Sequence, residues 1–170
     1  MAGSLRAACK KEEAQLNGRK VVVVDTPGFD SGRSLDEYNA AEVTGDMKLC
    51  SPGPHVIVHV MDPLCSSQKE MKMAQMIQEM FGLKAKDYII LLVTHKNDLE
   101  GKSVAKFISS SDASRKKYFA ECGNRCLAFN NKAKKAEREA QVAELMTMID
   151  ALVERNGDAP CYTEAMMKFK

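Results

Sequence analysis

The sequence predicts an α/β fold built on a largely parallel sheet. Three short and mainly apolar runs, at residues 21–24, 55–61 and 88–93, have the composition of buried strands. Segments with helical spacing of apolar residues follow the second and third runs, and such alternation is typical of βαβ units. A polar cluster follows each run, and open α/β sheets bind ligands at the carboxyl edge. We therefore expect a nucleotide-type site at one edge of the sheet.

Composition narrows the class of protein. The chain has 170 residues, of which 45% are hydrophobic and 28% are charged, which is globular composition. A net charge of +2 is too small to indicate a nucleic-acid partner. The sequence has no apolar run of the roughly 20 residues that span a membrane, and residues 1–11 have no apolar segment typical of a secretory signal. The six cysteines are scattered without a C-x-x-C pair, so we expect reduced thiols and a cytoplasmic protein.

The N-terminal third is expected to begin with a hairpin. Asn17-Gly18 is a strong turn signal, so a strand around residues 6–15 should pair antiparallel with the strand at 21–24. Residues 29–54 are rich in Ser, Gly, Asp and Pro, and are expected to form a loop with a short helix near residues 35–48.

The rest of the chain is expected to alternate strands and helices. The strand at 55–61 stops at Asp62-Pro63. A helix over 68–81 should begin after an N-cap at Ser66 or Ser67 and end at Gly82 in the left-handed conformation. The remaining elements are helices within 103–121, a short strand at 126–129 and a helix at 134–154.

Asp25 and Gly28 form a D-x-x-G motif directly after the first apolar strand. A carboxylate there can hold Mg²⁺, which binds through one or two carboxylates together with substrate phosphate. Glycine lets a backbone N–H approach a terminal phosphate. The same four residues, D-T-P-G, are also ordinary turn chemistry, and the motif alone does not separate the two interpretations.

A K-x-D motif, Lys96 and Asp98, follows the strand at 88–93. A carboxylate accepts two N–H bonds from one edge of guanine, which distinguishes guanine from adenine. Such tripeptides also occur in solvated loops. The K-x-D motif follows a strand, as the D-x-x-G motif does, and this position favours a role in binding the base. Gly101-Lys102-Ser103 resembles the end of a phosphate loop, but Lys96 stands where the first glycine should be.

A series of segments resembles the immunity-associated GTPases (GIMAP, the avirulence-induced-gene type) from about residue 9 to about residue 168. The segments are D-T-P-G, S-P-G-P-H, I-Q-E-M-F-G, T-H-K-N-D-L-E-G, E-C-G-N-R-C-L-A-F-N-N and E-A-Q-V-A-E-L. The resemblance implies a three-layer αβα domain of the P-loop GTPase type at residues 1–156, with residues 157–170 as a tail that leads out of it. It also implies binding of GTP or GDP with Mg²⁺ and a role in immunity. The implied site residues are Asp25 for magnesium, Gly28 for the γ-phosphate, His95, Lys96, Asn97 and Asp98 for the base, and Asn131 beside the base.

Four departures accompany the resemblance. His95 stands where the family usually has Arg, the loop after Gly28 is one residue shorter, and Arg6 falls near the place of the switch Thr. The fourth departure is that the sequence contains no G-x-x-x-x-G-K-[ST] motif. We therefore expect a partial domain that is missing the first strand, the phosphate loop and the first helix of the family fold.

These observations leave several functions open. The first is a guanine-nucleotide-binding module in which loss of the phosphate loop weakens binding and prevents efficient hydrolysis; no catalytic residue is assigned. The alternatives are a non-catalytic module that associates with other G domains, in homo- or hetero-assembly, and a fragment of a full-length GTP-binding protein. The missing central strand predicts open strand edges, which invite association.

Overall fold

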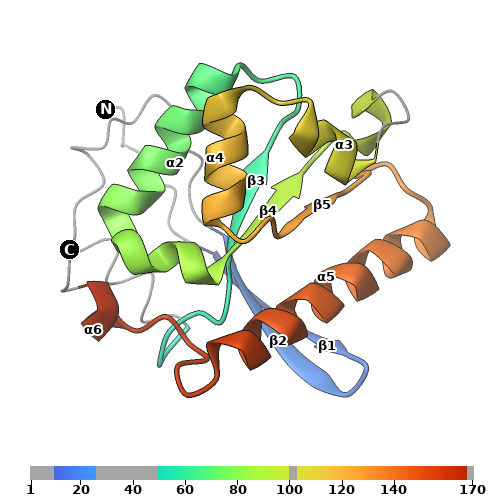
Figure 1. Cartoon of the computed structure of the whole chain (residues 1–170). Helices are drawn as coiled ribbons and strands as arrows, with labels where there is room; N and C mark the ends of the chain where they lie inside the picture. The colour runs from blue at the N-terminus through green and yellow to red at the C-terminus, as the bar shows by residue number, and fades with distance from the viewer. Residues whose placement is uncertain (1–9, 26–49, 100–102, 168–170) are drawn as a thin grey trace, which may run out of the picture. The chain divides into compact units, whose positions relative to one another are not determined.

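A computed structural model describes residues 10–25, 50–99 and 103–167 (Figure 1). The chain divides into two compact units, residues 1–54 and residues 55–170, and each is described by itself. The helix that we expect near residues 35–48 lies outside the described residues.

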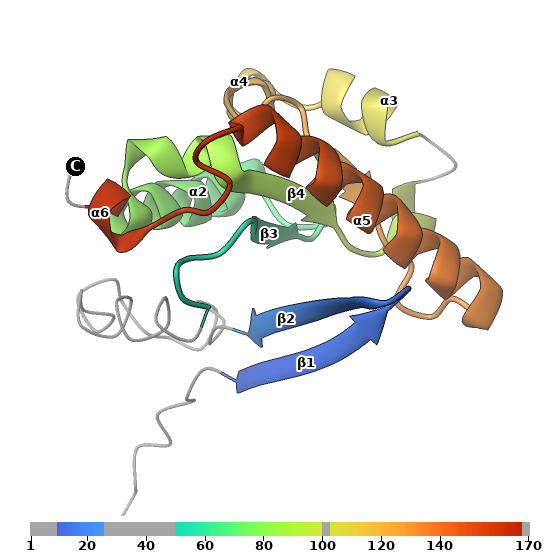
Figure 2. The same ribbon diagram turned by 90° about the horizontal axis from the view of Figure 1, so that it is seen from below.

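The first unit contains a two-stranded antiparallel ribbon, visible in Figure 2 as two adjacent arrows. Strand β1 (Lys10–Leu16) pairs with β2 (Arg19–Asp25). Asn17 and Gly18 have φ angles of 51° and 79°, and two successive positive angles are those of the type I′ turns that join hairpins. The predicted hairpin is therefore confirmed.

The prediction that residues 21–24 are buried is wrong. Val22 is 37% exposed and Val23 is 57% exposed, and the other two valines are only half-buried. The described sheet of this unit has only two strands, so β2 is not flanked by strands on both sides as in a larger parallel sheet. A continuous apolar run identifies a strand without fixing how deeply it is buried.

The second unit is built on a three-stranded parallel sheet in the order β3-β4-β5. The strands are β3 (Ile57–Met61), β4 (Ile89–Val93) and β5 (Cys126–Ala128), as predicted apart from small shifts at the ends. The register places Met61 beside Val93 and Val93 beside Ala128, so all three strands end at one level.

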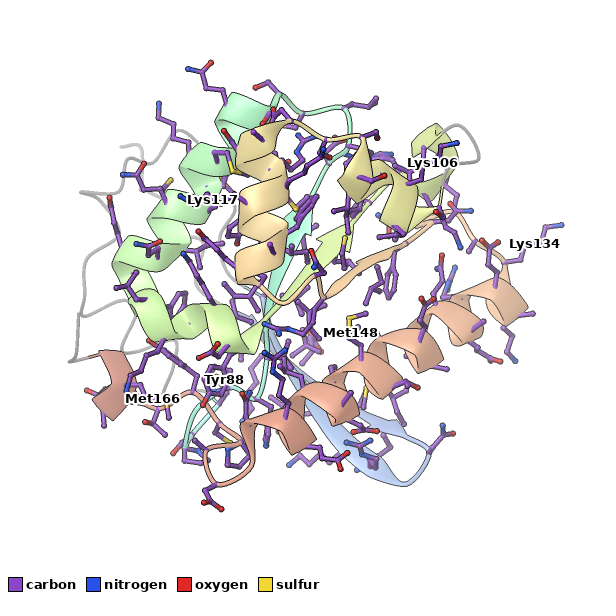
Figure 3. The ribbon with its side chains drawn as sticks, in the orientation of Figure 1. Tyr88, Lys106, Lys117, Lys134, Met148 and Met166 are labelled. Carbon is purple, nitrogen blue, oxygen red and sulfur yellow. The ribbon has the colours of Figure 1, made fainter. Side chains whose placement is uncertain are left out.

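Helices cover both faces of this sheet, which confirms the predicted three-layer arrangement. On one face, α5 (Lys135–Asn156) packs on β4 and β5, with Leu152 buried against Ile90 and Leu127. Met148 lies between α5 and the sheet (Figure 3). The other face carries the remaining long elements, α2 (Ser67–Phe81), α3 (Val104–Ser109) and α4 (Ala113–Glu121).

The ends of α2 test the predicted caps. Ser66 is the N-cap, and its hydroxyl accepts a hydrogen bond from the Lys69 N–H at 3.2 Å, as predicted. Gly82 ends the helix, but its φ and ψ of 94° and 174° are not those of a left-handed cap. After Gly82 the chain enters the 3₁₀ helix η3 (Leu83–Tyr88).

The segment after α5 packs on the domain, up to the short helix α6 (Glu164–Met167). Tyr162 is fully buried, and its hydroxyl donates to the Phe81 carbonyl. Tyr88, labelled in Figure 3, donates to the Ala159 carbonyl at 2.7 Å. That residues 157–170 lead out of the domain remains a prediction, and Tyr162 contributes to its core.

Candidate functional site

The loops that follow the three parallel strands start at a common edge of the sheet. Asp62, Thr94 and Phe129 are the first residues after β3, β4 and β5. Hydrogen bonds continue past the ladders, from the Thr94 N–H to the Met61 carbonyl and from the Phe129 N–H to the Val93 carbonyl, both 2.8 Å. The loops that carry the expected base-binding residues therefore start side by side, at the carboxyl edge where α/β sheets bind ligands.

The base-binding segment is held at both of its ends. His95 adopts a left-handed backbone with φ 54°, and the 3₁₀ helix η4 (Lys96–Leu99) follows. The Lys96 N–H donates to the Phe129 carbonyl at 3.1 Å. Leu99 is only 5% exposed and packs with Val93 and Ala128. The Lys96 side chain is exposed, and the side chains of Asn97 and Asp98 lie outside the described part of the structure.

The two asparagines of the turn at Asn130-Asn131 have different roles. Gln141, buried in α5, accepts from the Asn130 N–H at 2.7 Å and donates to the Asn130 carbonyl at 3.3 Å. The Asn130 side chain accepts from the Lys132 N–H at 3.0 Å. Asn131 is exposed, and its side chain has no hydrogen-bond partner within the described residues. Asn130 therefore shapes the turn and leaves the Asn131 amide available to a ligand.

Gln141 is a site residue that the sequence analysis did not find. It fixes the backbone of the Asn130 turn by bonding both its N–H and its carbonyl. The available signal was a polar residue one position before Val142, at the start of the apolar stripe of α5. A buried amide needs hydrogen-bond partners, and peptide groups of a turn can supply them.

His95 adds a titratable group to this edge. Its Nε2 lies 3.9 Å from Asp62 Oδ2, and both side chains are about half exposed. An exposed contact of this kind contributes roughly 0–1 kcal/mol to stability. The backbone geometry of His95, rather than this contact, positions the start of the base-binding segment.

A buried polar cluster lies on β3 next to the edge. His59, 3% exposed, has Nδ1 at 2.8 Å from the Tyr118 hydroxyl, and its Nε2 lies 3.8 Å from Glu70 Oε2. Burial lowers the pKa of His59 to about 4 and raises the pKa of Glu70. A neutral His59 makes the contact with Glu70 a dipolar one rather than an ion pair. Glu70 Oε1 also accepts from the Asp62 N–H at 3.2 Å, so the cluster supports the loop after β3.

The two D-x-x-G residues are only partly described. Asp25 is the last residue of β2 and is exposed, in the first unit, while Gly28 lies outside the described residues. Within the ranges 10–25, 50–99 and 103–167, three or more potential metal ligands do not cluster. The Asp25 carboxylate suits a single hard-oxygen ligand of Mg²⁺. The structure thus brings together the segment 95–98 and the turn at 130–131, and the roles of Asp25 and Gly28 stay predictions.

A parallel sheet covered by helices on both faces, with polar loops at its carboxyl edge, has the architecture of the P-loop GTPase-like α/β domains. Within that class, the chain belongs to the AIG1 family, which matches it over residues 1–170. The family resemblance that the sequence motifs indicate is therefore confirmed.

Curated relatives include mammalian and plant proteins. The chain is 31% identical over 150 residues to human GTPase IMAP family member 8, covering 88% of the chain and 22% of that protein. It is 32% identical over 163 residues to Arabidopsis thaliana immune-associated nucleotide-binding protein 5, covering 92% of the chain and 54% of that protein. For Arabidopsis thaliana immune-associated nucleotide-binding protein 1 the identity is 28% over 178 residues, covering 95% of the chain and 76% of that protein.

The chain spans about a fifth of the length of its mammalian relatives and about half of several plant relatives. Among the helices that the structure describes, none is both long and apolar enough to cross a membrane.

Proposed function

We propose that this chain binds a guanine nucleotide, GTP or GDP, at the carboxyl edge of its parallel sheet. The observation that carries the proposal is the hydrogen bond from the Lys96 N–H to the Phe129 carbonyl. This bond joins the K-x-D segment to the turn that presents Asn131. Two loops distant in sequence thus start side by side, which supports a shared binding site for their side chains. Relatives named as a GTPase and as nucleotide-binding proteins support the same activity.

Each site residue has a distinct role in this proposal. Asp98 accepts both N–H groups on one edge of guanine, the Lys96 stem lies along the purine face, and Asn131 supplies an amide beside the base. His95 and Asn97 flank the base reader. Asp25 holds Mg²⁺ and Gly28 lets the backbone approach the terminal phosphate.

Nucleotide binding by this chain alone is proposed to be weak. Its 170 residues contain no G-x-x-x-x-G-K-[ST] motif. In that motif, backbone N–H groups and a lysine bind the nucleotide phosphates, and this chain does not supply those contacts through it. Hydrogen bonds to charged groups are worth about 1.5–3 kcal/mol each, and losing several weakens binding by orders of magnitude. We do not propose efficient hydrolysis by this chain alone.

The base-reading role of Asp98 provides the direct test. In titrations with fluorescent nucleotides, the chain should bind the guanine analogue more tightly than the adenine analogue. Asp98→Asn should lose about tenfold or more in guanine affinity, because an amide cannot accept both N–H bonds. It should gain relative affinity for xanthine, which offers an acceptor in place of one donor.

Asp158→Asn is the matched control, because Asp158 is exposed beyond the end of α5 and away from the carboxyl edge of the sheet. The proposal fails if Asp98→Asn keeps full guanine selectivity, or if Asp158→Asn changes it equally. Submicromolar GTP affinity of the unmodified chain would contradict only the proposed weakening by the missing motif.

A second candidate function is association with another G domain in the cytoplasm. β3 lies at the end of the described three-stranded sheet, and its Val58 and Val60 are 39% and 54% exposed. These two side chains share a face with Ile90 and Leu92 of the neighbouring strand, because they are paired in register. An edge strand with exposed valines favours pairing with a further strand.

A further inference from the structure

Two arginine side chains converge at the end of β5 opposite the proposed nucleotide edge. Arg125 directly precedes β5, and Arg155 lies in the last turn of α5. Nη1 of Arg125 occupies the space that a Cβ on Gly123 would fill, and Nη1 of Arg155 lies 3.1 Å from that point. The two guanidinium groups therefore meet over one glycine.

Arg125 is held rigidly by its backbone partners. Its Nε donates to the Ile89 carbonyl at 2.9 Å, and its Nη2 donates to the Lys86 carbonyl at 2.6 Å. These bonds connect the residue before β5 to the start of β4 and to η3. They leave Nη1 without a hydrogen-bond partner among the described residues, directed over Gly123. The guanidinium is thus preorganised and retains unused donors.

Arg155 contributes a second cation to this convergence. Its side chain is exposed and forms neither a hydrogen bond nor an ion pair with the residues that the structure describes. Burial lowers the pKa of Arg125 and the nearby Arg155 lowers it further, while Cys122 and Asp87 act in the opposite direction. Glu121 is already paired with Lys86 at 2.5 Å. The convergence therefore retains an excess of positive charge.

Gly123 provides the space that this convergence needs. Its φ of +65° lies in the left-handed region, where glycine carries no steric penalty. A side chain at this position would displace the Arg125 guanidinium. The positive φ is one reason for a glycine at position 123. The second reason is that a glycine has no Cβ, which leaves room for both guanidinium groups beside the backbone.

We propose that Arg125 and Arg155 form a phosphate-binding site over Gly123, separate from the proposed nucleotide site. Two guanidinium groups present several N–H donors in planar forks, which match the geometry of phosphate oxygens. A dianionic phosphate also relieves the repulsion between the two cations. A carboxylate satisfies one fork with a single charge, so phosphate is the better match. Arg125 and Asn130 lie before and after β5, which places the two sites at opposite ends of that strand.

The test measures binding of inorganic phosphate to the full 170-residue chain by titration calorimetry, at constant ionic strength set with chloride. We expect specific binding by the unmodified chain and a dissociation constant at least about tenfold higher for Arg155→Gln, as expected for the loss of one charge-assisted bond. Arg155→Lys should lie between the two, because it keeps the charge and loses the fork. Arg138→Gln, an exposed change near the other end of α5, is the control and should bind phosphate normally.

O-phosphoserine and acetate distinguish the chemistry of the ligand. O-phosphoserine should compete with inorganic phosphate and show the same dependence on Arg155, whereas acetate should not compete at equal concentration. The proposal is overturned if Arg155→Gln binds phosphate as the unmodified chain does, which would place any bound phosphate elsewhere, including the nucleotide edge. It is also overturned if acetate competes equally, or if phosphate shows no binding beyond chloride.

Discussion

Strands β2 and β4 have similar sequences and different surroundings. β2 contains four consecutive valines and β4 reads I-I-L-L-V, so both carry the continuous apolar pattern of a buried strand. In β4, Ile90, Leu91 and Val93 are fully buried. In β2, Val23 is 57% exposed. The difference shows that apolar composition selects the strand conformation, whereas burial depends on neighbours in the fold.

The neighbours of β4 explain the contrast. It lies between β3 and β5, and side chains from α5 pack against Ile90 on one face. On the other face, Val93 packs with residues that include Val104 and Phe107 of α3. β2 has β1 as its partner in a two-stranded sheet. Sheets of two strands are marginal by themselves, so the two units should differ in stability.

The largest expected effect comes from a cavity beside β4. Ile90→Ala removes a fully buried side chain from the cluster with Leu127 and Leu152. We expect it to lower the free energy of unfolding by about 3–5 kcal/mol, in the upper part of the range for buried aliphatic residues. Denaturant unfolding monitored by circular dichroism measures the change.

Val23→Ala in β2 is the comparison variant for that measurement. Because Val23 is largely exposed, its truncation should change the free energy of unfolding by less than about 0.5 kcal/mol. Equal losses for the two variants would contradict the contrast between β2 and β4.

Strand β3 combines both environments, and its buried face carries His59. His59 has a pKa of about 4 in the folded chain against 6.5 for an unperturbed histidine. Between pH 6.5 and 4 the unfolded chain binds a proton at this residue and the folded chain does not, so stability falls as the pH falls. The full effect is about 3 kcal/mol. The raised pKa of Glu70 acts in the opposite direction, since the folded state takes up its proton first.

His59→Asn isolates the histidine contribution, because it removes the titration and keeps an amide to bond Tyr118. Unfolding measured from pH 7 to pH 4 should show a smaller acid loss in this variant than in the unmodified chain. His95→Asn is the comparison variant, since it replaces a half-exposed histidine and asparagine tolerates the positive φ of this position. Identical acid loss in all three proteins would show that His59 is not the group responsible.

The smallest effect on stability is expected at the exposed face of β3. Val60→Lys should change the free energy of unfolding by about 0.5 kcal/mol or less, because Val60 is 54% exposed. It should nevertheless reduce self-association in size-exclusion chromatography, since a charge on an edge strand opposes further strand pairing.

Leu64→Lys serves as the control for Val60→Lys. Leu64 is 72% exposed and lies in the loop after β3, outside the sheet. It should leave self-association unchanged. A monodisperse 18.8 kDa monomer before any substitution would remove the reason to propose association through β3.

The sequence predicted the fold well where local signals and tertiary contacts agree. The Asn17-Gly18 turn, the Ser66 cap and the parallel strands all follow from short-range chemistry. The left-handed cap at Gly82 was wrong because glycine permits several positive-φ conformations, and the choice depends on the 3₁₀ helix that follows. The burial of Tyr162 was not foreseen, because it depends on contacts with Phe81 and Tyr88 that lie far away in sequence.

The sequence predicted where the segments of the candidate site lie, but not the residues that support them. Motif spacing suggested Lys96 and Asp98, the family resemblance added Asn131, and strand polarity predicted that their segments lie at one edge, whereas the roles of the three side chains stay predictions. The position of Gln141 before the apolar stripe of α5 was only a weak signal for its role, and the different roles of Asn130 and Asn131 had no signal in the sequence. Both depend on which face of α5 meets the turn. Asp25 and Gly28 carry the same kind of motif evidence, and their roles still rest on it.

The most direct test of the central claim is nuclear magnetic resonance of the ¹⁵N-labelled chain during titration with GDP and Mg²⁺. The account predicts that the largest shifts among the described residues occur at the amides of Lys96, Asn97 and Asn131, at the ends of β4 and β5. The turn at Asn17-Gly18 should change little, and ADP should produce much smaller shifts than GDP. Equal shifts with both nucleotides, or shifts that leave Lys96 and Asn131 unchanged, would contradict guanine recognition at this edge.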